Sequence, residues 1–328
     1  MADDLPLIRA RSLSEAIAHL SARGSHLVAG GTDLAGSMHV DRRRPVKVVD
    51  ISEIEELRGF TPTPDGGLRI GALATLSALA SDAALQATYP AIATAARASG
   101  PAELRGRATL GGNLCQRPRC WYLRGDAVCV RKGGDLCFAV DGENRYHAVL
   151  GATHCHMVHA SDLAPALVAF DARARLVGPD GMRVLPLEDF FLPPGLDPRR
   201  ENVLGQAEVL TDVLLPPAPA GWASSFVRAN EPHTDYALAS VASTMLTLEG
   251  RVAKVSVILG AAAPTPWRSR EAESGLIGGQ ATPRAVREAA DAALVDALPL
   301  ADNRYKIALF RDLLVEALES VSGLRPPA

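Results

Sequence analysis

The sequence lacks several features that would assign it to a broad class of proteins. No stretch of its 328 residues approaches the roughly 20 consecutive apolar residues of a membrane-spanning helix. The 34 lysines and arginines are outnumbered by 37 aspartates and glutamates, so the chain has none of the basic excess typical of nucleic-acid-binding surfaces. We therefore expect no membrane span and no nucleic-acid partner, and instead a small-molecule or protein partner.

The first twenty residues, MADDLPLIRARSLSEAIAHL, do not have the pattern of a secretory leader. Acidic residues occupy the positions where such a leader carries positive charge, and no long apolar segment follows them. We therefore expect a cytoplasmic protein. Export to the periplasm together with a partner that carries a leader would look the same in this sequence and stays open.

Common catalytic and phosphate-binding motifs are also missing. The chain has no Walker motif, no G-x-G-x-x-G fingerprint, no nucleophile elbow and no H-E-x-x-H. Single carboxylates such as Asp33 and Glu103 are most often solvated or helix caps. We therefore predict no catalytic side chain of this protein's own, and expect bound cofactors to carry out the chemistry.

Apolar periodicity predicts a mixed helix and strand (α+β) fold without internal repeats. Ser12 and Glu15 form a capping box ahead of a helix from about Leu13 to Ser21. The proline-rich segment Leu215–Gly221 is the predicted start of a C-terminal domain. The remaining expected elements are strands at 26–29, 46–51 and 68–73, helices at 75–82 and 90–99, hairpins at 172–185 and 239–259, and helices starting near Pro283 and Tyr305.

Two paired-glycine turns are present, Val28-Ala-Gly-Gly-Thr-Asp33 and Thr109-Leu-Gly-Gly-Asn113. Paired glycines let backbone N–H groups converge on an anion, and each turn has a hydroxyl or amide donor beside it. Two such turns could clasp a pyrophosphate. A single Gly-Gly pair is usually only a turn, so the glycines alone leave both interpretations open.

All five cysteines lie between Cys115 and Cys155. A disulfide-stabilised secreted protein would spread its cysteines, so this clustering favours metal or redox use. Zinc is one alternative, because His154, His156 and His159 lie near Cys155, but the C-x₂₋₄-C pairs of structural zinc sites are absent. Four unligated cysteines are another alternative.

Five sequence motifs occur in a characteristic order: LVAGGTDL, TLGGNL, HASDLAPALVAFDA, EVLTDVLLP and DYALASVA. In this order the sequence resembles the FAD-binding subunit of the molybdenum hydroxylases, a family that includes xanthine dehydrogenase, carbon monoxide dehydrogenase and the aldehyde oxidoreductases. The resemblance covers nearly the whole chain. It implies two FAD-binding subdomains of the vanillyl-alcohol-oxidase (PCMH) type, at 1–58 and 59–215. An α+β domain like that of the carbon monoxide dehydrogenase flavoprotein is then expected at 216–328.

The resemblance also implies which residues bind FAD. The two glycine turns would hold its diphosphate, Ser161 and Asp162 would lie near the adenosine part, and Leu210 would lie against the flavin. A helix N-cap is the alternative for Asp162, and a role for Arg228 near the flavin is left open. The implied FAD-binding residues are Leu27, Val28, Ala29, Gly30, Gly31, Thr32, Asp33, Leu34, Thr109, Gly112, Asn113, Gln116, Ser161, Asp162 and Leu210.

About forty residues separate the second glycine turn from Ser161, which is long for a structureless connection. This insertion, about 115–157, is similar to the segment that holds an extra [4Fe–4S] cluster in the flavin subunits of 4-hydroxybenzoyl-CoA reductase and of the PaoABC-type bacterial aldehyde oxidoreductase. The matching phrases are QRPRCWYLR, AVCVRKGG, DLCFAV and HAVLGATHCHMVHASD. The resemblance implies a [4Fe–4S] cluster on Cys120, Cys129, Cys137 and Cys155.

Cys115 is then left over, and we expect it to be a small buried side chain. The histidines near Cys155 are expected at the surface or in hydrogen bonds. The basic residues of the insertion either form a solvated face or offset the charge of cluster and diphosphate; they are Arg117, Arg119, Arg124, Arg131 and Lys132.

The function implied by the resemblance is that of an electron-transfer subunit in a heterotrimeric molybdenum hydroxylase. Substrate would react at a molybdenum cofactor in a large partner subunit, and electrons would cross [2Fe–2S] clusters in a small partner to FAD in this chain. The [4Fe–4S] cluster would link FAD to an external acceptor: ferredoxin, a quinone, oxygen or NAD. We expect aldehyde oxidation. The alternatives are hydroxybenzoyl-CoA reduction, a self-sufficient flavin oxidoreductase and a zinc-stabilised scaffold.

Overall fold

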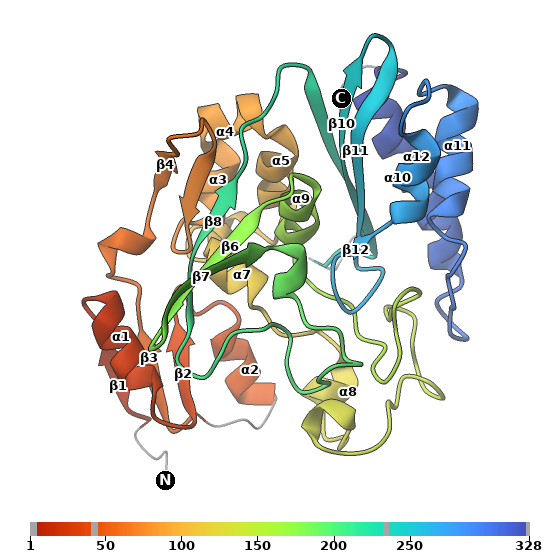
Figure 1. The fold of residues 1–328 in the computed structure, drawn as a ribbon. Coiled ribbons are helices and arrows are strands. Elements are labelled where there is room, and N and C mark those ends of the chain that lie inside the picture. The colour runs from red at the N-terminus through yellow and green to blue at the C-terminus, as the bar shows by residue number, and fades with distance from the viewer. Residues whose placement is uncertain (1–4, 41–44, 232–235, 326–328) are drawn as a thin grey trace.

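The computed structural model describes residues 5–40, 45–231 and 236–325, and these residues form three β-sheets with helices packed on them (Figure 1). The sheets follow one another along the chain. The first lies at the N-terminal end, the second runs through the middle, and the third lies with the C-terminal helices on the far side. Mixed helix and sheet structure, as expected for an α+β fold, is confirmed.

The first sheet is parallel, with strand order β1-β3-β2. Helix α1 is capped by Ser12, whose Oγ accepts the Glu15 N–H at 3.2 Å, as the capping box predicts. Apolar residues of α1 and β3 share a small core with the loop that follows β3. The elements of this part are β1 (Leu7–Arg9), α1 (Leu13–Leu20), β2 (Ser25–Val28), α2 (Leu34–Val40), β3 (Lys47–Asp50) and η1 (Glu55–Leu57).

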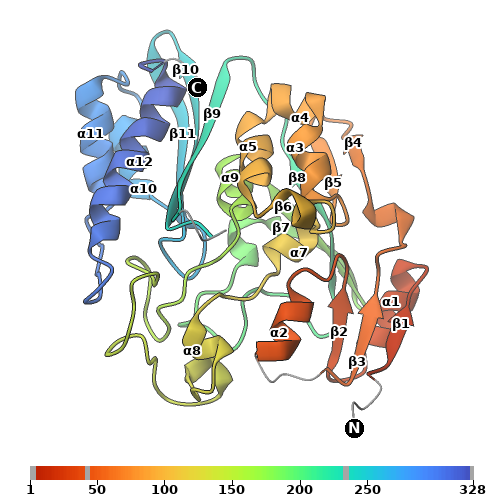
Figure 2. The ribbon, with the colours of Figure 1, turned by 180° about the vertical axis from the view of Figure 1, so that it is seen from behind.

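The second sheet is antiparallel, with order β4-β5-β8-β6-β7, and the predicted hairpin at 172–185 is its β6-β7 pair. Its largest core lies between the sheet and helices α3, α5 and α9, which are seen from the helix side in Figure 2. Helix α4 was not predicted. The elements are β4 (Phe60–Pro62), β5 (Leu68–Gly71), α3 (Leu76–Ser81), α4 (Ala83–Thr88), α5 (Pro90–Ala98), α6 (Ala102–Arg105), α7 (Leu110–Leu114), α9 (Leu163–Ala169), β6 (Arg173–Gly178), β7 (Gly181–Pro186), η3 (Glu188–Phe190) and β8 (Val209–Leu215).

The third sheet, of order β12-β11-β10-β9, is also antiparallel, and its helices cover one face. Thr282 caps α11 and Pro283 is its first residue, as predicted. Asp235, the first residue of the DYALASVA motif, lies outside the described residues. The elements are β9 (Trp222–Ala229), β10 (Ala239–Leu248), β11 (Arg251–Gly260), β12 (Trp267–Arg268), α10 (Arg270–Leu276), α11 (Pro283–Ala292) and α12 (Tyr305–Ser322). The exact domain limits at residues 58 and 215 stay a prediction.

The insertion at 115–157 is mostly irregular and contains only α8 (Trp121–Arg124) and η2 (Val130–Lys132). Its backbone is anchored on the C-terminal domain: Asn303 Nδ2 donates to the carbonyls of His147 and Ala148, both at 3.1 Å. Lys306 Nζ donates to His147 O at 3.2 Å and to Ala261 O at 2.6 Å. Lys306 is fully buried, and burial lowers its pKa to about 7. The insertion is therefore packed into the molecule, although it has little regular structure.

A buried ion-pair network joins the second and third sheets. Arg268 of β12 contacts Glu273 at 2.9 Å within its own domain and Asp171, beside α9, at 2.9 Å. A third carboxylate, Glu188 of η3, lies 3.4 Å away. The guanidinium of Arg268 is only 12% exposed, so its charge depends on these partners.

Replacing Arg268 should therefore be costly. We expect Arg268→Ala to lower the free energy of unfolding by about 3 kcal/mol, because the buried Glu273 carboxylate loses its partner. Arg270→Ala is the matched control: Arg270 is 68% exposed and pairs only with Glu188 among the ion pairs of the described residues. It should cost under about 1 kcal/mol. Urea unfolding of both variants measures this, and equal losses would contradict the importance of the network.

Candidate functional site

The first glycine turn connects β2 to α2 and touches the backbone ahead of the second. Gly31 has a φ of +74°, a conformation that favours glycine. A Cβ on Gly30 would lie 1.7 Å from the carbonyl oxygen of Arg107. The two loops therefore approach so closely that only glycine fits between them.

The second glycine segment is not a turn, which corrects the sequence prediction. It is α7, a single helical turn that Thr109 caps by accepting the Gly112 N–H at 3.2 Å. Leu110 and Leu114, four residues apart, are both buried, and this spacing holds the segment as a helix. A Cβ on Gly111 would lie 3.0 Å from the Cβ of Ala72, so this glycine is also closely packed.

A cavity of about 250 Å³, called here the loop cavity, lies between the two glycine segments. Ser37 of α2 lines it, and its buried Oγ has no hydrogen-bond partner among the described residues. No sequence pattern pointed to Ser37. Most of the predicted FAD-binding residues line this cavity: Leu27, Val28, Ala29, Gly30, Gly31, Thr32, Asp33, Leu34, Thr109, Gly112 and Leu210.

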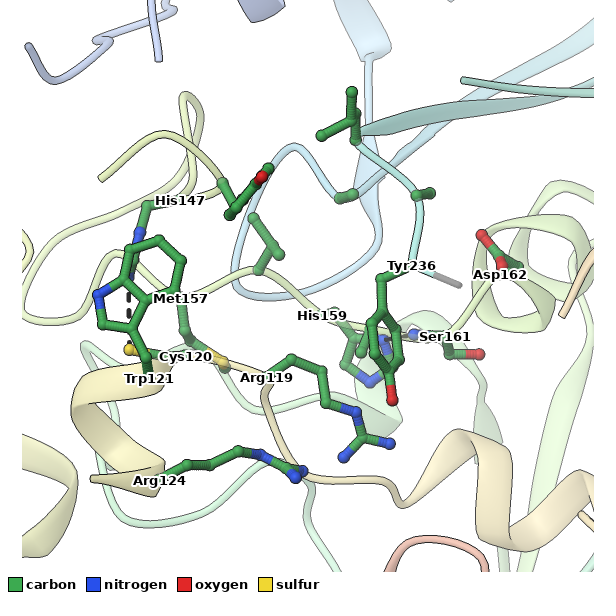
Figure 3. A pocket seen from close by; sticks show the side chains of 16 residues that line it. Arg119, Cys120, Trp121, Arg124, His147, Met157, His159, Ser161, Asp162 and Tyr236 are labelled. Carbon is green, nitrogen blue, oxygen red and sulfur yellow. Dashed lines mark hydrogen bonds between the residues drawn. The ribbon is translucent and has the colours of Figure 1, made fainter. Parts of the chain in front are cut away.

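A second cavity of about 380 Å³, called here the insertion cavity, is shown in Figure 3. Three parts of the chain line it: the insertion, the Ser161-Asp162 pair, and Tyr236 to Leu238 ahead of β10. The guanidinium of Arg119 lies over the ring of Tyr236, 5.0 Å from its centroid. Ser161 and Asp162 therefore line a different cavity from the glycine loops.

Asn113 and Gln116, the remaining predicted FAD-binding residues, line neither cavity, but Asn113 connects α7 to Ser161 of the insertion cavity. Ser161 Oγ donates to Asn113 Oδ1 at 2.5 Å, and Gln116 Nε2 donates to Asn113 O at 2.9 Å. Ser161 Oγ also accepts the Ala164 N–H at 2.9 Å, so it caps α9. Asp162 is the N-cap residue of α9 by position, as the alternative interpretation expects, but its side chain makes no cap hydrogen bond. Ser161, the preceding residue, provides the side-chain cap of α9 instead.

Asp162 is buried beside Arg228 of β9, whose Nε lies 3.6 Å from Oδ2. Burial raises the pKa of Asp162 to about 6, although the nearby guanidinium favours its charged form. Arg228 also donates to Ala98 O. Arg228, whose role near the flavin was left open, is thus a partner of Asp162.

Asp33 is not solvated, although a single carboxylate usually is. It is 20% exposed and accepts hydrogen bonds from the Arg117 N–H at 3.0 Å and from the Arg119 guanidinium. Arg124 NH2 lies 3.5 Å away. The basic residues of the insertion are not a solvated face either, since Arg131 is 1% exposed.

Cys115 is separate from the other cysteines. Its side chain is half-buried and packs against the core of the second sheet. Burial, together with the nearby carboxylates of Glu201 and Asp33, raises the pKa of the Cys115 thiol to about 12. It is therefore a neutral thiol that packs against the core.

The other four cysteines influence one another electrostatically. The Cys137 and Cys155 thiols interact strongly with each other, and this interaction lowers the pKa of Cys137 and raises that of Cys155. Cys120 interacts with both Cys129 and Cys137. Cys129 and Cys155 are buried, and Cys120 and Cys137 are half-buried.

Two basic side chains accompany these thiols. His147 Nε2 lies 3.3 Å from Cys120 Sγ (Figure 3), and Arg131 interacts with Cys155. No three His, Cys, Asp or Glu side chains in the described residues are placed to hold one metal ion. In a [4Fe–4S] cluster each cysteine binds a different iron, so the ligand sulfurs surround the cluster and do not converge on one point. The donor set of four grouped thiols fits such a cluster.

The predicted histidines divide between surface and interior. His154 is exposed, His156 is half-buried, and His159 is buried in the wall of the insertion cavity. His159 Nδ1 accepts the Ser161 N–H at 3.3 Å, and burial lowers the pKa of His159 to about 4. It is therefore neutral and hydrogen-bonded, as expected. Its place in the cavity wall was not predicted.

Comparisons with known proteins agree with this architecture. Residues 3–218 match the family described as the FAD binding domain in molybdopterin dehydrogenase, and residues 224–321 match the CO dehydrogenase flavoprotein C-terminal domain. Among the described residues, no helix has the length and apolar character needed to cross a membrane.

Relatives and solved structures cover nearly the whole chain. It is 33% identical to the aldehyde oxidoreductase FAD-binding subunit PaoB of Escherichia coli (strain K12), over 90% of this chain and 91% of that one. It is 28% identical to the carbon monoxide dehydrogenase medium chain of Hydrogenophaga pseudoflava, over 94% of both. A solved carbon monoxide dehydrogenase structure from that organism matches with a TM-score of 0.78 and 26% identity, over 98% of this chain and 99% of that one.

The fold and the loop cavity thus define a flavoprotein with an FAD-binding domain followed by a CO dehydrogenase-type C-terminal domain. The chain belongs to the FAD-binding medium subunits of the molybdenum hydroxylase family and is an oxidoreductase subunit.

The close approach at Gly30 gives a direct test of the loop cavity. Gly30→Ala should lower the FAD content of the purified protein at least tenfold, because its Cβ would collide with the Arg107 carbonyl and separate the loops. Gly36→Ala is the control, since nothing lies within 4 Å of a Cβ there. Flavin released on denaturation is measured by fluorescence. Full FAD content in Gly30→Ala would argue against this site.

Proposed function

We propose that this chain holds FAD with the diphosphate between the two glycine segments and the two ends of the cofactor in the loop cavity and the insertion cavity. The observation that carries the proposal is the meeting of both glycine segments in one cavity, with Gly30 against the Arg107 backbone. When bound, FAD exchanges electrons in pairs or singly.

The residues of the chain fit this role. Thr109 and Gly112, at the start of α7, line the loop cavity, and the missing side chain of Gly112 lets a cofactor approach the backbone closely. Ser37 supplies an unused hydroxyl in the same cavity. The hydrogen bond between Asn113 and Ser161 fixes α7 relative to the wall of the insertion cavity. These groups would bind and orient the cofactor and exclude water from it.

We further propose that Cys120, Cys129, Cys137 and Cys155 hold a [4Fe–4S] cluster. Support comes from the electrostatic grouping of these four thiols and from the separate position of Cys115. Cationic groups near the thiols, including the buried Arg131, would offset the negative charge of four thiolates.

With both cofactors, the chain would act as the electron-transfer subunit of a heterotrimer. A large molybdenum-cofactor subunit and a small [2Fe–2S] subunit would be its partners, and it would pass electrons to an external acceptor. Aldehydes are the proposed substrate class, because PaoB is an aldehyde oxidoreductase subunit and matches over 90% of the chain. The substrate would react on the large partner subunit.

Cofactor analysis tests both assignments together. Protein purified without oxygen should contain about four irons and four acid-labile sulfides per FAD, as one [4Fe–4S] cluster requires. After reduction it should give an iron–sulfur EPR signal. Flavin without iron would leave the FAD assignment standing and overturn the cluster. Zinc in place of iron would support the zinc alternative.

The ligand assignment has a matched pair of variants. Cys155→Ser should remove most of the iron, because one of four ligands is lost, whereas Cys115→Ser should keep it. Both side chains lie in the same insertion and both changes are nearly isosteric. Iron content per chain is the measurement. Loss of iron in Cys115→Ser alone would reverse the assignment of the odd cysteine.

A further inference from the structure

Two carboxylates from outside the cysteine-bearing segment contact the arginines of that segment. Asp33 belongs to the first glycine loop, and Glu201 lies between η3 and β8. Both are close enough to Cys115 to raise the pKa of its thiol, so they stand near the point where the insertion begins. Together with the insertion arginines that they contact, they form the set called here the carboxylate clamp.

Asp33 contacts the part of the insertion that faces the flavin-binding cavities. It accepts the Arg117 N–H at 3.0 Å, and the guanidinium groups of Arg119 and Arg124 share its other oxygen. Asp33 lines the loop cavity, whereas Arg119 and Arg124 line the insertion cavity. In Figure 3 these two arginines extend toward the same side of the insertion cavity.

Glu201 contacts the part that faces the cysteines. Its Oε1 lies 2.5 Å from Arg131 NH2 and 3.5 Å from Arg117 Nε. Arg131 is buried, with 1% of its side chain exposed, and it interacts with Cys155. The Glu201 carboxylate therefore fixes a guanidinium that contacts a proposed cluster ligand.

The charges explain why Asp33 is unsuited to contact the diphosphate directly. A carboxylate and a diphosphate both accept hydrogen bonds and carry negative charge, so they repel one another. Paired with Arg119 and Arg124, Asp33 instead fixes two cations in the wall of the insertion cavity. These contacts thereby fix Arg119 and Arg124, which precede and follow Cys120 in the sequence.

We propose that Asp33 and Glu201 are positioning residues that couple the two cofactor sites, so that FAD binding and cluster assembly stabilise each other. The inference rests on the proposed presence of both cofactors. With the cluster assembled, the segment around Cys120 holds Arg119 and Arg124 in place. These arginines in turn hold the first glycine loop, through Asp33, in the arrangement that FAD binds. Coupling of this kind is reciprocal, so bound FAD also favours the assembled cluster.

The test compares FAD binding with and without the cluster in two full-length proteins, the natural chain and Asp33→Asn. Each is prepared without iron and after cluster reconstitution, and the FAD dissociation constant is measured by fluorescence quenching without oxygen. In the natural chain, reconstitution should tighten FAD binding about tenfold, within the usual range of coupling between two sites. In Asp33→Asn, reconstitution should change the FAD dissociation constant by less than about twofold.

Further variants separate the clamp from a general loss of charge or of folding. Asp180→Asn changes an exposed aspartate in the β6-β7 turn. In this variant, reconstitution should tighten FAD binding as much as in the natural chain. Glu201→Gln should weaken coupling, because it releases Arg131. The EPR spectrum of the reduced cluster should change on FAD addition in the natural chain and stay the same in Asp33→Asn.

The outcomes distinguish the clamp from the proposed function. Equal tightening in the natural chain and Asp33→Asn, or no tightening in a natural chain that binds both cofactors, would overturn the clamp alone. A natural chain that binds FAD but assembles no cluster would overturn the cluster proposal and the clamp with it. Should Asp33→Asn fail to fold, Glu201→Gln and the EPR comparison on the natural chain decide.

Discussion

The close approach of two backbone segments at Gly30 is the constraint on which the cofactor site depends. Because the Arg107 carbonyl lies where a side chain would begin, the first sheet and the α7 region of the second are held in contact without any side chain between them. The loop cavity exists because of this contact, and α2 and β8 complete its walls. The shape of the loop cavity, where FAD is proposed to bind, therefore depends on these few atoms.

Ion pairs and hydrogen bonds hold the irregular insertion, residues 115–157, against the rest of the fold. Its arginines meet carboxylates from the FAD-binding part of the chain, and its backbone carbonyls meet Asn303 and Lys306 from the C-terminal part. Because these contacts reach both neighbours, the segment is fixed in place without helices or strands of its own. This arrangement suits a redox site, since small displacements of ligands change the energies of electron transfer.

Local patterns in the sequence were enough to predict the four longest helices and several of the strands. The capping box at Ser12 and the Thr282-Pro283 start were confirmed, because such signals depend on neighbouring residues alone. Features that depend on distant partners were missed. The role of Asp33 depends on arginines about 85 residues away, and the contact of Ser161 with Asn113 joins residues 48 positions apart. The helical form of α7 likewise depends on burial of Leu110 and Leu114.

The contacts of Lys306 and Asn303 also bear on how such a subunit could gain or lose its cysteine-bearing segment. Both side chains are fully buried and donate to the carbonyl of His147. A chain shortened by residues 115–157 would leave the Asn303 amide without these two acceptors and Lys306 with the Ala261 carbonyl alone. Removal of the segment in evolution or in engineering would therefore require compensating changes at Asn303 and at the start of α12, more than 140 residues downstream.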